Sequence, residues 1–200
     1  MRDFFQTEIR SFDVVRQFPW TDRRGYADFL AQTYYYVCHT TRLLAVSAAR
    51  IGVQREKLHH RFLKHAAQER SHHLLAERDL QQLGYRLSSF PERALTASLY
   101  ESQYYRAEHL CPTMIFGYIF ALEGLAAVHG PYVYRAIYDH YGDDCASFVK
   151  LHANEDPGHL EATFEIVETL SSEEAARIKD NFLFTRDLYK ALLGQIQAGD

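Results

Sequence analysis

Apolar residues recur every three or four positions along most of the chain, and no strictly alternating stretch lasts more than a few residues. This spacing predicts amphipathic helices, because a half-exposed strand would alternate instead. Glycine and proline divide the pattern into helix-length segments. We expect helices over residues 3–18, 23–51, 55–83, 91–109, 112–129, 131–155 and 171–194, the sixth of them interrupted near 142–144. Pro157 either kinks the chain or starts a further segment that reaches about residue 170.

No linker or internal repeat separates these segments, so they predict one all-α domain over residues 1–200. The last helix has the clearest start signal, because Ser171 and Glu174 have the spacing of a capping box. The segment from Thr113 to Val128 is strongly apolar, but it is short and carries a carboxylate. We therefore expect it to be a core helix and not a membrane span.

Two of the predicted helices carry polar residues on the face that should pack against the core. In the helix over 55–83, His65, Glu69 and His72 follow each other at steps of four and three, with apolar residues before and after them. The stretch that ends near 155 and continues past Pro157 repeats the arrangement, and there the polar residues are His152, Asp156 and His159. Side chains at such steps share one face of a helix.

Glu123 is the only charged residue among the 16 from Thr113 to Val128. An ionised carboxylate buried without a partner costs several kcal/mol or more. No lysine or arginine lies three or four positions away from it. Glu123 must therefore be protonated, paired with a distant base, or bound to a metal ion.

One site would account for all of these residues. We expect the following side chains to converge as metal ligands: Glu69, His72, Glu123, His152, Asp156 and His159. Imidazoles with carboxylates suit iron or manganese and do not suit a thiolate zinc site. Six ligands are more than one cation with an open position needs, which favours two cations. Glu69–His72 and Asp156–His159 also have the i, i+3 spacing by which helical bundles hold di-iron centres.

Three further histidines are second-rank candidates. His73 competes with His72, because a step of four from Glu69 reaches nearly as far as a step of three. His65 and His39, each taken alone, are more typical of hydrogen-bonded core residues. We expect the neighbouring substrate pocket to be aromatic, with Tyr35, Phe116 and Phe120 in its wall, and Tyr35, Tyr118 or Gln32 to orient the imidazoles.

The net charge of −4 leaves no basic surplus to neutralise phosphates, so we expect no nucleic-acid partner. The three cysteines are odd in number and widely spaced. They indicate reduced thiols in a cytoplasmic protein. The first residues carry charges throughout and do not resemble a signal peptide.

The H-x3-D-x2-H run at His152, Asp156 and His159, together with Glu123 and an earlier acid–histidine pair, resembles the haem-oxygenase-like di-iron oxidases and oxygenases. Uncharacterised members of that group are labelled iron-containing redox enzymes. The resemblance extends from about residue 20 to 190 and includes QTYYYVCHTTRLLAVSAAR and LHANEDPGHLEATFEI. It implies a bundle of about seven helices, usually a homodimer, with a non-haem di-iron cofactor held by the six residues above. Several members separate the first acid from its histidine by about two helical turns, where this chain has His65, so His65 or His73 could replace a ligand.

We therefore expect an oxidase or oxygenase that uses dioxygen and two iron ions, or a manganese–iron pair, to oxidise a small molecule. The resemblance implies N-oxygenation of an amine, or oxidative C–C cleavage of an amino acid or fatty acid, with electrons from an external donor where they are needed. A ferritin-like ferroxidase is one alternative, but it would need a carboxylate within residues 26–51, where only Asp28 occurs. A metal-free, thiaminase-like hydrolase with a cysteine nucleophile is another, and a non-catalytic scaffold is the third.

Overall fold

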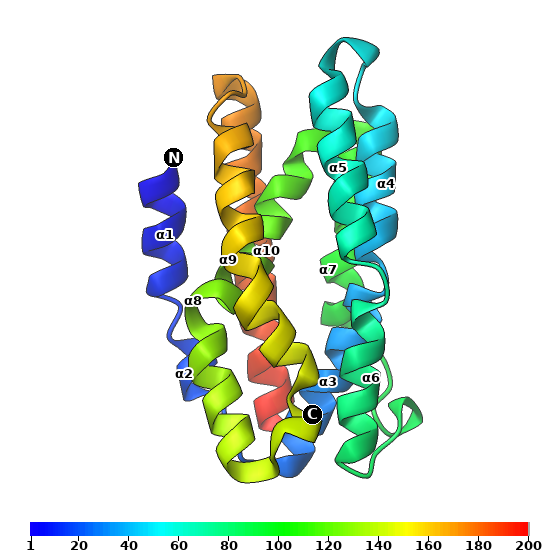
Figure 1. Ribbon diagram of the computed structural model, residues 1–200, viewed down its shortest axis with the longest axis vertical. Coiled ribbons are helices and arrows are strands. Elements are labelled where there is room, and N and C mark those ends of the chain that lie inside the picture. The colour runs from blue at the N-terminus through cyan, green and yellow to red at the C-terminus, as the bar shows by residue number, and fades with distance from the viewer. Residues whose placement is uncertain (200) are drawn as a thin grey trace.

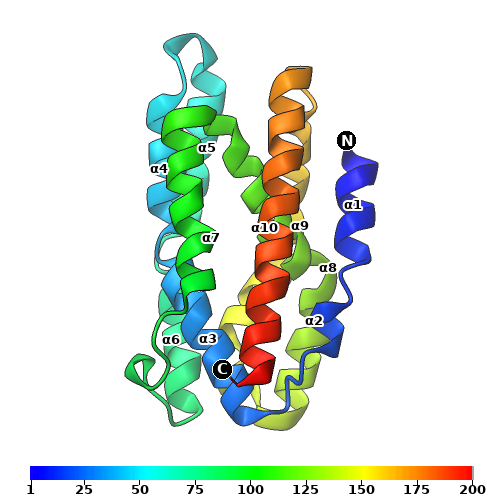
Figure 2. The same ribbon diagram turned by 180° about the vertical axis from the view of Figure 1, so that it is seen from behind.

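The computed structural model describes residues 1–199, and in this range the chain is helical throughout apart from short turns, with no strand (Figures 1 and 2). The α-helices are α1 (Arg2–Arg10), α2 (Val14–Gln17), α3 (Arg23–Val37), α4 (Thr40–Arg50), α5 (Glu56–Gln68), α6 (His72–Gln82), α7 (Ala94–Tyr105), α8 (Ile115–Tyr141), α9 (Ser147–Val167) and α10 (Ser172–Ala198). The all-α prediction is confirmed.

Breaks of two or three residues divide three of the predicted helices. They separate α1 from α2, α3 from α4 and α5 from α6, and without them the described chain has seven helical units, as expected. At Cys38 the chain tightens, because His39 N–H bonds to Tyr36 O, three residues back. At Ser71 the backbone is left-handed, with φ of 72°. Neither break has a glycine or proline signal in the sequence.

Pro131, which was expected to start a new helix, and Pro157, which was expected to kink the chain or start a further segment, both lie inside helices. Pro131 lies within α8 and Pro157 within α9, so residues 112–129 and 131–141 do not form separate helices. Packing outweighs the local cost of proline, about 3 kcal/mol in a helix interior. α8 meets α9 closely here, because a Cβ built on Gly130 would lie 3.0 Å from Ala153 Cβ. Both helices change direction along their length (Figure 1).

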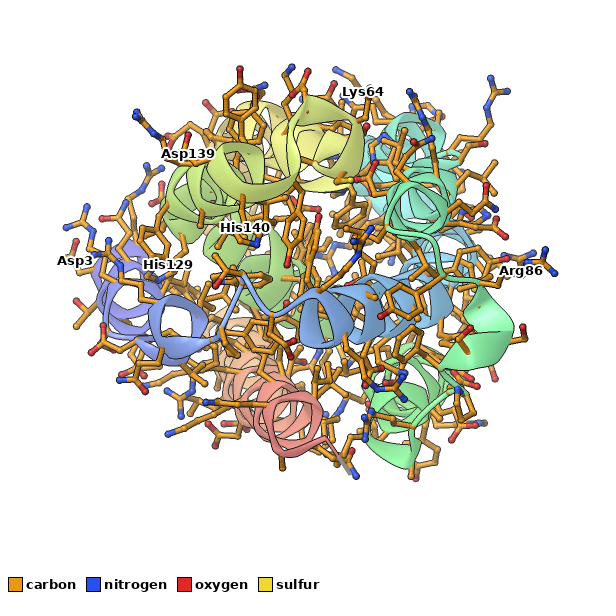
Figure 3. The ribbon with its side chains drawn as sticks, turned by 90° about the horizontal axis from the view of Figure 1, so that it is seen from below. Asp3, Lys64, Arg86, His129, Asp139 and His140 are labelled. Atoms are coloured by element: carbon orange, nitrogen blue, oxygen red, sulfur yellow. The ribbon has the colours of Figure 1, made fainter. Side chains whose placement is uncertain are left out.

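α8 is the core helix of the bundle and packs against α1, α9 and α10. Together with the turn before it (112–141), it is long and apolar enough to cross a membrane, yet 78% of its most apolar stretch is buried inside the fold. Its composition is therefore explained by core packing, as expected. His129 of α8 bonds through Nε2 to Ile9 O at 2.9 Å, which fixes α1 against this helix (Figure 3).

The predicted capping box begins α10. Glu174 N–H donates to Ser171 Oγ at 3.2 Å, and Ser171 N–H donates back to the Glu174 carboxylate at 3.3 Å. The helix continues past the expected end at Gly194 and stops at Gly199, which has φ of 75°. α10 thus spans the length of the bundle and covers one side of α8 (Figure 2).

Candidate metal centre

The candidate ligands come from four helices whose side chains meet inside the bundle. Glu69 directly follows α5 and His72 is the first residue of α6, so the turn through Ser71 lies between them. Glu123 comes from the middle of α8, while His152, Asp156 and His159 come from one face of α9. Residues expected on one continuous helix face thus belong to the end of one helix and the start of the next.

The structure brings these side chains together as two groups that share Glu69. In the first group, His65, Glu69, Glu123 and His159 each offer one ligand atom, and these atoms all lie within 4.8 Å of one another. In the second group, Glu69, His72 and His152 meet the same criterion. Such spacing fits one cation in each group.

Glu69 directs one oxygen toward each group. Its Oε1 lies 3.6 Å from His65 Nε2 and 3.8 Å from His159 Nδ1, whereas its Oε2 lies 3.2 Å from His72 Nδ1. His65 Nε2 is also 2.9 Å from Glu123 Oε1. Glu69 is therefore placed to bridge two cations.

Asp156 lies at the edge of this arrangement. It is buried, and its Oδ1 is 3.6 Å from His159 Nδ1, but it does not belong to either group of converging atoms. The structure thus brings five of the six predicted residues into the two groups, adds His65 from the second rank, and places Asp156 beside His159.

Several polar atoms of the cluster are buried without a standard hydrogen bond in the described chain. They are His65 Nε2, Glu69 Oε1, His72 Nδ1, Glu123 Oε2, Asp156 Oδ1 and His159 Nδ1. Buried polar atoms nearly always have a hydrogen-bond partner, so six that have at most ion-pair contacts with one another need an explanation. Metal ions would supply it, because nitrogen and carboxylate oxygen are the donors that iron and manganese accept. The donor set therefore fits two such ions.

The pKa values describe protons that the metal-free cluster holds. Burial alone would lower the pKa of His65, but the charges of Glu123 and Glu69 outweigh it and raise the pKa to about 9. Burial, with repulsion from Glu123 and Glu69, raises the pKa of Asp156 to about 8 despite its contact with His159. For Glu69, contacts with His65 and His72 outweigh burial and hold its pKa well below the usual range. Cations would replace these protons.

In the metal-free chain the base that pairs directly with Glu123 is His65, not an arginine or a lysine. Arg61 lies one turn before His65 on α5. Burial lowers the pKa of Arg61, and the negative charge of Glu123 partly opposes this effect. No arginine or lysine within residues 1–199 forms an ion pair with Glu123 inside 4 Å. Its close cationic neighbour is His65.

The other two second-rank histidines lie outside the groups. His73 packs edge-on against Tyr34, with ring centroids 5.4 Å apart. His39 stacks on Tyr100 at 3.7 Å and contacts the Tyr104 hydroxyl. Adjacent helical positions point about 100° apart, so only one of His72 and His73 can face the cluster.

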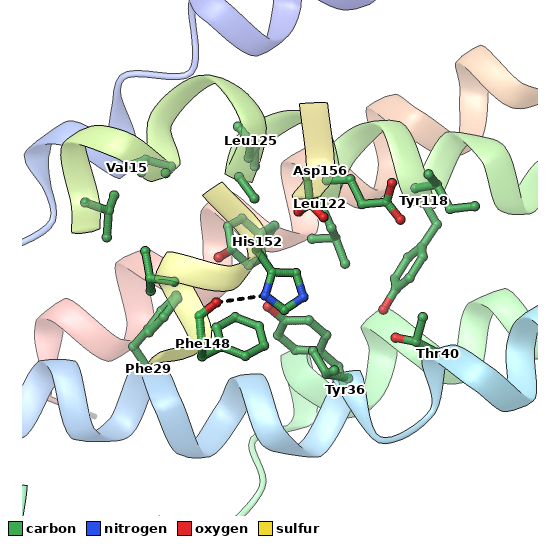
Figure 4. A pocket seen from close by; sticks show the side chains of 18 of the residues that line it. Val15, Phe29, Tyr36, Thr40, Tyr118, Leu122, Leu125, Phe148, His152 and Asp156 are labelled. Carbon is green, nitrogen blue, oxygen red and sulfur yellow. Dashed lines mark hydrogen bonds between the residues drawn. The ribbon is translucent and has the colours of Figure 1, made fainter. Parts of the chain in front are cut away.

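A cavity adjoins the cluster, with Glu69, Glu123, His152 and Asp156 in its wall (Figure 4). The residues predicted for the substrate pocket, Tyr35, Phe116 and Phe120, are not among those that line this cavity. Tyr35 donates to Leu87 O and Phe90 O, Phe116 stacks on Phe62, and Phe120 stacks on Phe5. Their places are taken by residues on neighbouring faces of the same helices, namely Tyr36, Ile119 and Leu122.

The orientation of one imidazole comes from a group that the sequence did not indicate. His152 Nδ1 lies 2.8 Å from Phe148 O, so Nδ1 donates to this carbonyl and Nε2 is left to bind a metal ion (Figure 4). Gln32 instead bonds to Asp28, Thr96 and the backbone near Pro91. Tyr118 lines the cavity, and its buried hydroxyl has no hydrogen-bond partner in residues 1–199.

Comparison with known proteins gives the family and the fold of this chain. Residues 27–190 match the model of a family described as iron-containing redox enzymes. A search of curated proteins finds no significant match. Among solved structures, a domain of unknown function with a heme oxygenase-like fold from Shewanella denitrificans superposes with a TM-score of 0.85 at 19% identity, over 99% of this chain and 90% of that one. A TenA homolog from Pseudomonas syringae has a TM-score of 0.77 at 12% identity, over 96% and 89%. The haem-oxygenase-like fold is thereby confirmed.

Proposed function

The chain belongs to the iron-containing redox enzyme family, and on that premise we propose that it is a non-haem di-iron oxidase or oxygenase that uses dioxygen to oxidise a small organic molecule. The observation that carries the proposal is the position of Glu69, whose two oxygens face two separate groups of buried ligand atoms. Shared carboxylates of this kind are how helical bundles hold two metal ions.

In this proposal one ion is held by His65, Glu69, Glu123 and His159, and the other by Glu69, His72 and His152. When bound, the two ions supply the electrons that dioxygen requires to react with a closed-shell organic molecule. The Phe148 carbonyl keeps the His152 ring in one tautomer. Burial raises the pKa of Asp156 to about 8, and its Oδ1 lies 3.6 Å from His159 Nδ1, so this pair can hold or release a proton beside the centre.

The surroundings keep water away from the centre. Tyr36, Ile119 and Leu122 line the cavity beside the carboxylates, so a small substrate would displace water there. The proposal includes an external electron donor, a homodimeric assembly and a cytoplasmic location. A manganese–iron pair would use the same ligands.

Anaerobic titration with ferrous iron tests the metal centre. The unaltered protein should bind about two equivalents, and brief exposure to oxygen should then produce a transient visible band. The double variant Glu123→Ala with His159→Ala should lose tight binding of iron, because both residues belong to the first group. Glu155→Ala is the matched control, since Glu155 is an exposed carboxylate beside Asp156 on α9. Unchanged iron binding by the double variant would overturn the proposal.

The same samples separate the alternatives. Continued iron oxidation without organic substrate, with mineral formation, would indicate a ferroxidase. The similarity in fold to a TenA homolog is the reason to test the second alternative, a metal-free hydrolase. None of the three cysteines lines the cavity, and burial raises the pKa of both Cys38 and Cys145, which weakens them as nucleophiles. Full activity after removal of metal by a chelator would support the hydrolase.

A further inference from the structure

Positive charge is concentrated on α5 and α6, although the chain as a whole is negative. Residues 50–78 contain seven lysines and arginines and three acidic residues, whereas the rest of the chain contains 15 basic and 23 acidic residues. Of the three acidic residues, Glu69 is buried in the ligand cluster and Glu77 is half-buried. The exposed basic residues on α5, on α6 and in the turn between them form what we call the basic face, namely Lys57, Lys64, Arg70 and Arg78.

The charges of the basic face are not neutralised within the chain. None of its four residues forms an ion pair within 4 Å among residues 1–199, where the pairs nearest to them in sequence are made by Arg55, His60 and the buried His65. Elsewhere on the surface, by contrast, Arg135 and Lys150 pair with nearby carboxylates. The basic face therefore presents a positive potential that selects a negatively charged partner.

Two exposed leucines accompany the basic face. Leu63 is adjacent to Lys64 on α5, and Leu74 lies one helical turn before Arg78 on α6. Their exposed fractions are 43% and 48%. A few apolar contacts surrounded by charge are typical of small, transient protein interfaces, in which charge sets the rate of encounter.

Only the thickness of α5 separates the basic face from the ligand cluster. Lys64 lies at the outer edge of the molecule (Figure 3), while the next residue, His65, is buried with its Nε2 2.9 Å from Glu123 Oε1. Arg70 in turn directly follows Glu69. A helix with its side chains is about 10–12 Å across, so the basic face lies about one helix diameter from the ligand atoms. Electrons cross such a distance through protein without a channel.

The cavity beside the cluster does not open onto this face. Within residues 1–199, no residue of α5 or α6 lines the cavity, and Glu69 is the lining residue from the turn between these helices. A carrier protein that delivers a substrate would need access to the cavity, and the basic face offers none. A partner that delivers only electrons needs no such access.

We propose that the basic face is the docking site for a small acidic protein that carries one electron at a time. The inference rests on the proposed function, because it names the partner that supplies electrons to the same centre. In each encounter the donor passes one electron to the centre and is itself oxidised by one electron, and no atom is transferred.

Calorimetric titration tests the docking directly, with the chain both metal-free and loaded with iron. The probes are an acidic plant-type [2Fe–2S] ferredoxin and an acidic flavodoxin, and at least one of them should bind saturably at low salt. The Debye length falls from about 30 Å at 0.01 M salt to about 8 Å at 0.15 M, so the Kd should weaken by at least about 10-fold between these concentrations. Basic cytochrome c should not bind under either condition.

Charge-reversed variants test the location. The triple variant Lys57→Glu, Lys64→Glu and Arg70→Glu should weaken binding of the acidic probe by at least about 10-fold at low salt. The matched control is Arg10→Glu, Lys179→Glu and Lys190→Glu, which changes net charge equally at exposed positions on α1 and α10 and should bind as the unaltered protein does.

Reduction kinetics provide a second measurement. In the iron-loaded triple variant, reduction by the acidic probe should slow by the same factor as binding weakens, while reduction by dithionite should not change. If the triple variant does not fold, as judged by circular dichroism, the exposed single variant Lys64→Glu and the salt dependence of the unaltered protein decide the question.

No saturable binding of either acidic probe, binding that is insensitive to salt, or equal weakening by the two triple variants would each overturn the proposal. Binding to vesicles of anionic phospholipid that the acidic probes cannot displace would also overturn it, in favour of a membrane contact. Docking to the metal-free chain without binding of two iron equivalents would contradict the proposed function and leave the docking site standing. Binding of two iron equivalents without docking would do the opposite.

Discussion

Glu69 is the residue on which both proposed metal positions depend, because its two oxygens face different histidines. Its location right after α5 explains how it can do so. A side chain in the middle of a straight helix would meet neighbours on one face, whereas the turn through Ser71 brings His72 to the other side of the same carboxylate. The second group of ligands therefore depends on this turn.

The neighbouring histidines at the start of α6 give a prediction at this scale. His72→Ala should remove the second metal position or weaken its affinity by at least 10–100-fold, because a direct ligand matters no less than its supporting partners do. His73→Ala should bind iron as the unaltered protein does, since His73 packs on Tyr34. Equilibrium titration with ferrous iron measures both. Equal loss in the two variants would contradict the assignment.

The convergence of these acidic and histidine residues was predictable from the sequence because they interrupt apolar stripes, a signal that survives errors in helix boundaries. The wall of the cavity was not predictable in the same way. Tyr35 and Tyr36 are both aromatic, and only the rotation of α3 about its axis decides that Tyr36 faces the cavity. His65 has the same spacing as the other residues of the cluster. Its partner Glu123 lies 58 positions further along the chain on another helix, so the sequence did not indicate that the two side chains meet.

Among the elements, α6 and α9 are joined by a buried carboxylate. Asp79 of α6 accepts a hydrogen bond from Phe148 N–H at 2.8 Å, at the start of the helix that carries His152. Burial raises the pKa of Asp79 to about 6. Its folded pKa therefore lies above its ordinary value of 3.8, and the stability that the protonated form contributes is lost as the pH rises from about 4 through 6.

Asp79→Asn should remove this dependence on pH, because an amide can still accept from Phe148 and has no charge to bury. The free energy of unfolding of the variant minus that of the unaltered protein should be larger at pH 7.5 than at pH 4.5, by about 1–3 kcal/mol. Urea denaturation at the two pH values measures the gain. Asp144→Asn, at an exposed position, should show no such change. A gain that is equal at both pH values would argue against the buried charge as its cause.

Gly117 allows α8 to pack closely against the backbone of α10 because it has no side chain. A Cβ on Gly117 would lie 2.3 Å from Ile178 O and 2.7 Å from Phe182 N, and these are backbone atoms that cannot move aside locally. Gly117→Ala should therefore reduce the free energy of unfolding by about 1–3 kcal/mol or more. Gly194→Ala in α10 meets no atom within 4 Å and should increase it by about 0.5–1 kcal/mol. Denaturant unfolding compares the two, and a gain for both would contradict the close packing.

The sequence predicted which segments are helical, but it did not predict where a helix is interrupted or continues. The capping box of Ser171 marks the start of α10 in sequence and structure alike. Pro131 and Pro157 have the local signal of a helix boundary, yet both lie inside continuous helices, α8 and α9, which pack against each other. Ser71 has no such signal and still interrupts a helix, because its backbone is left-handed with φ of 72°.

For the molecule as a whole, the metal-free state concentrates several carboxylates and histidines in its interior. Any ion that binds only the folded form adds to its stability, by about 2.7 kcal/mol at a free concentration 100 times its Kd. We expect ferrous or manganous ions to raise the melting temperature by about 5–10 °C, since 1 kcal/mol corresponds to about 2–4 °C at this size. Differential scanning calorimetry with and without a chelator measures the change.

The affinity for metal ions should also depend on pH. Metal ions compete with the protons held by His65 and Asp156, whose pKa values are about 9 and 8. The apparent affinity for metal should therefore increase as the pH rises from 6 to 9. Magnesium is the control, because it prefers oxygen ligands and water and should give little stabilisation. Stabilisation that is independent of pH would show that these protons are not displaced.

Phe148 connects the metal centre to the apolar cavity through three contacts. Its N–H binds Asp79, its carbonyl holds the imidazole of His152, and its ring lies against that imidazole with centroids 4.1 Å apart while also facing the cavity. A ligand in the cavity that displaces this ring must also tilt the His152 imidazole or lengthen the hydrogen bond between His152 Nδ1 and Phe148 O. In the proposed oxidase, occupancy of the cavity and the alignment of the His152 imidazole would therefore be coupled through Phe148.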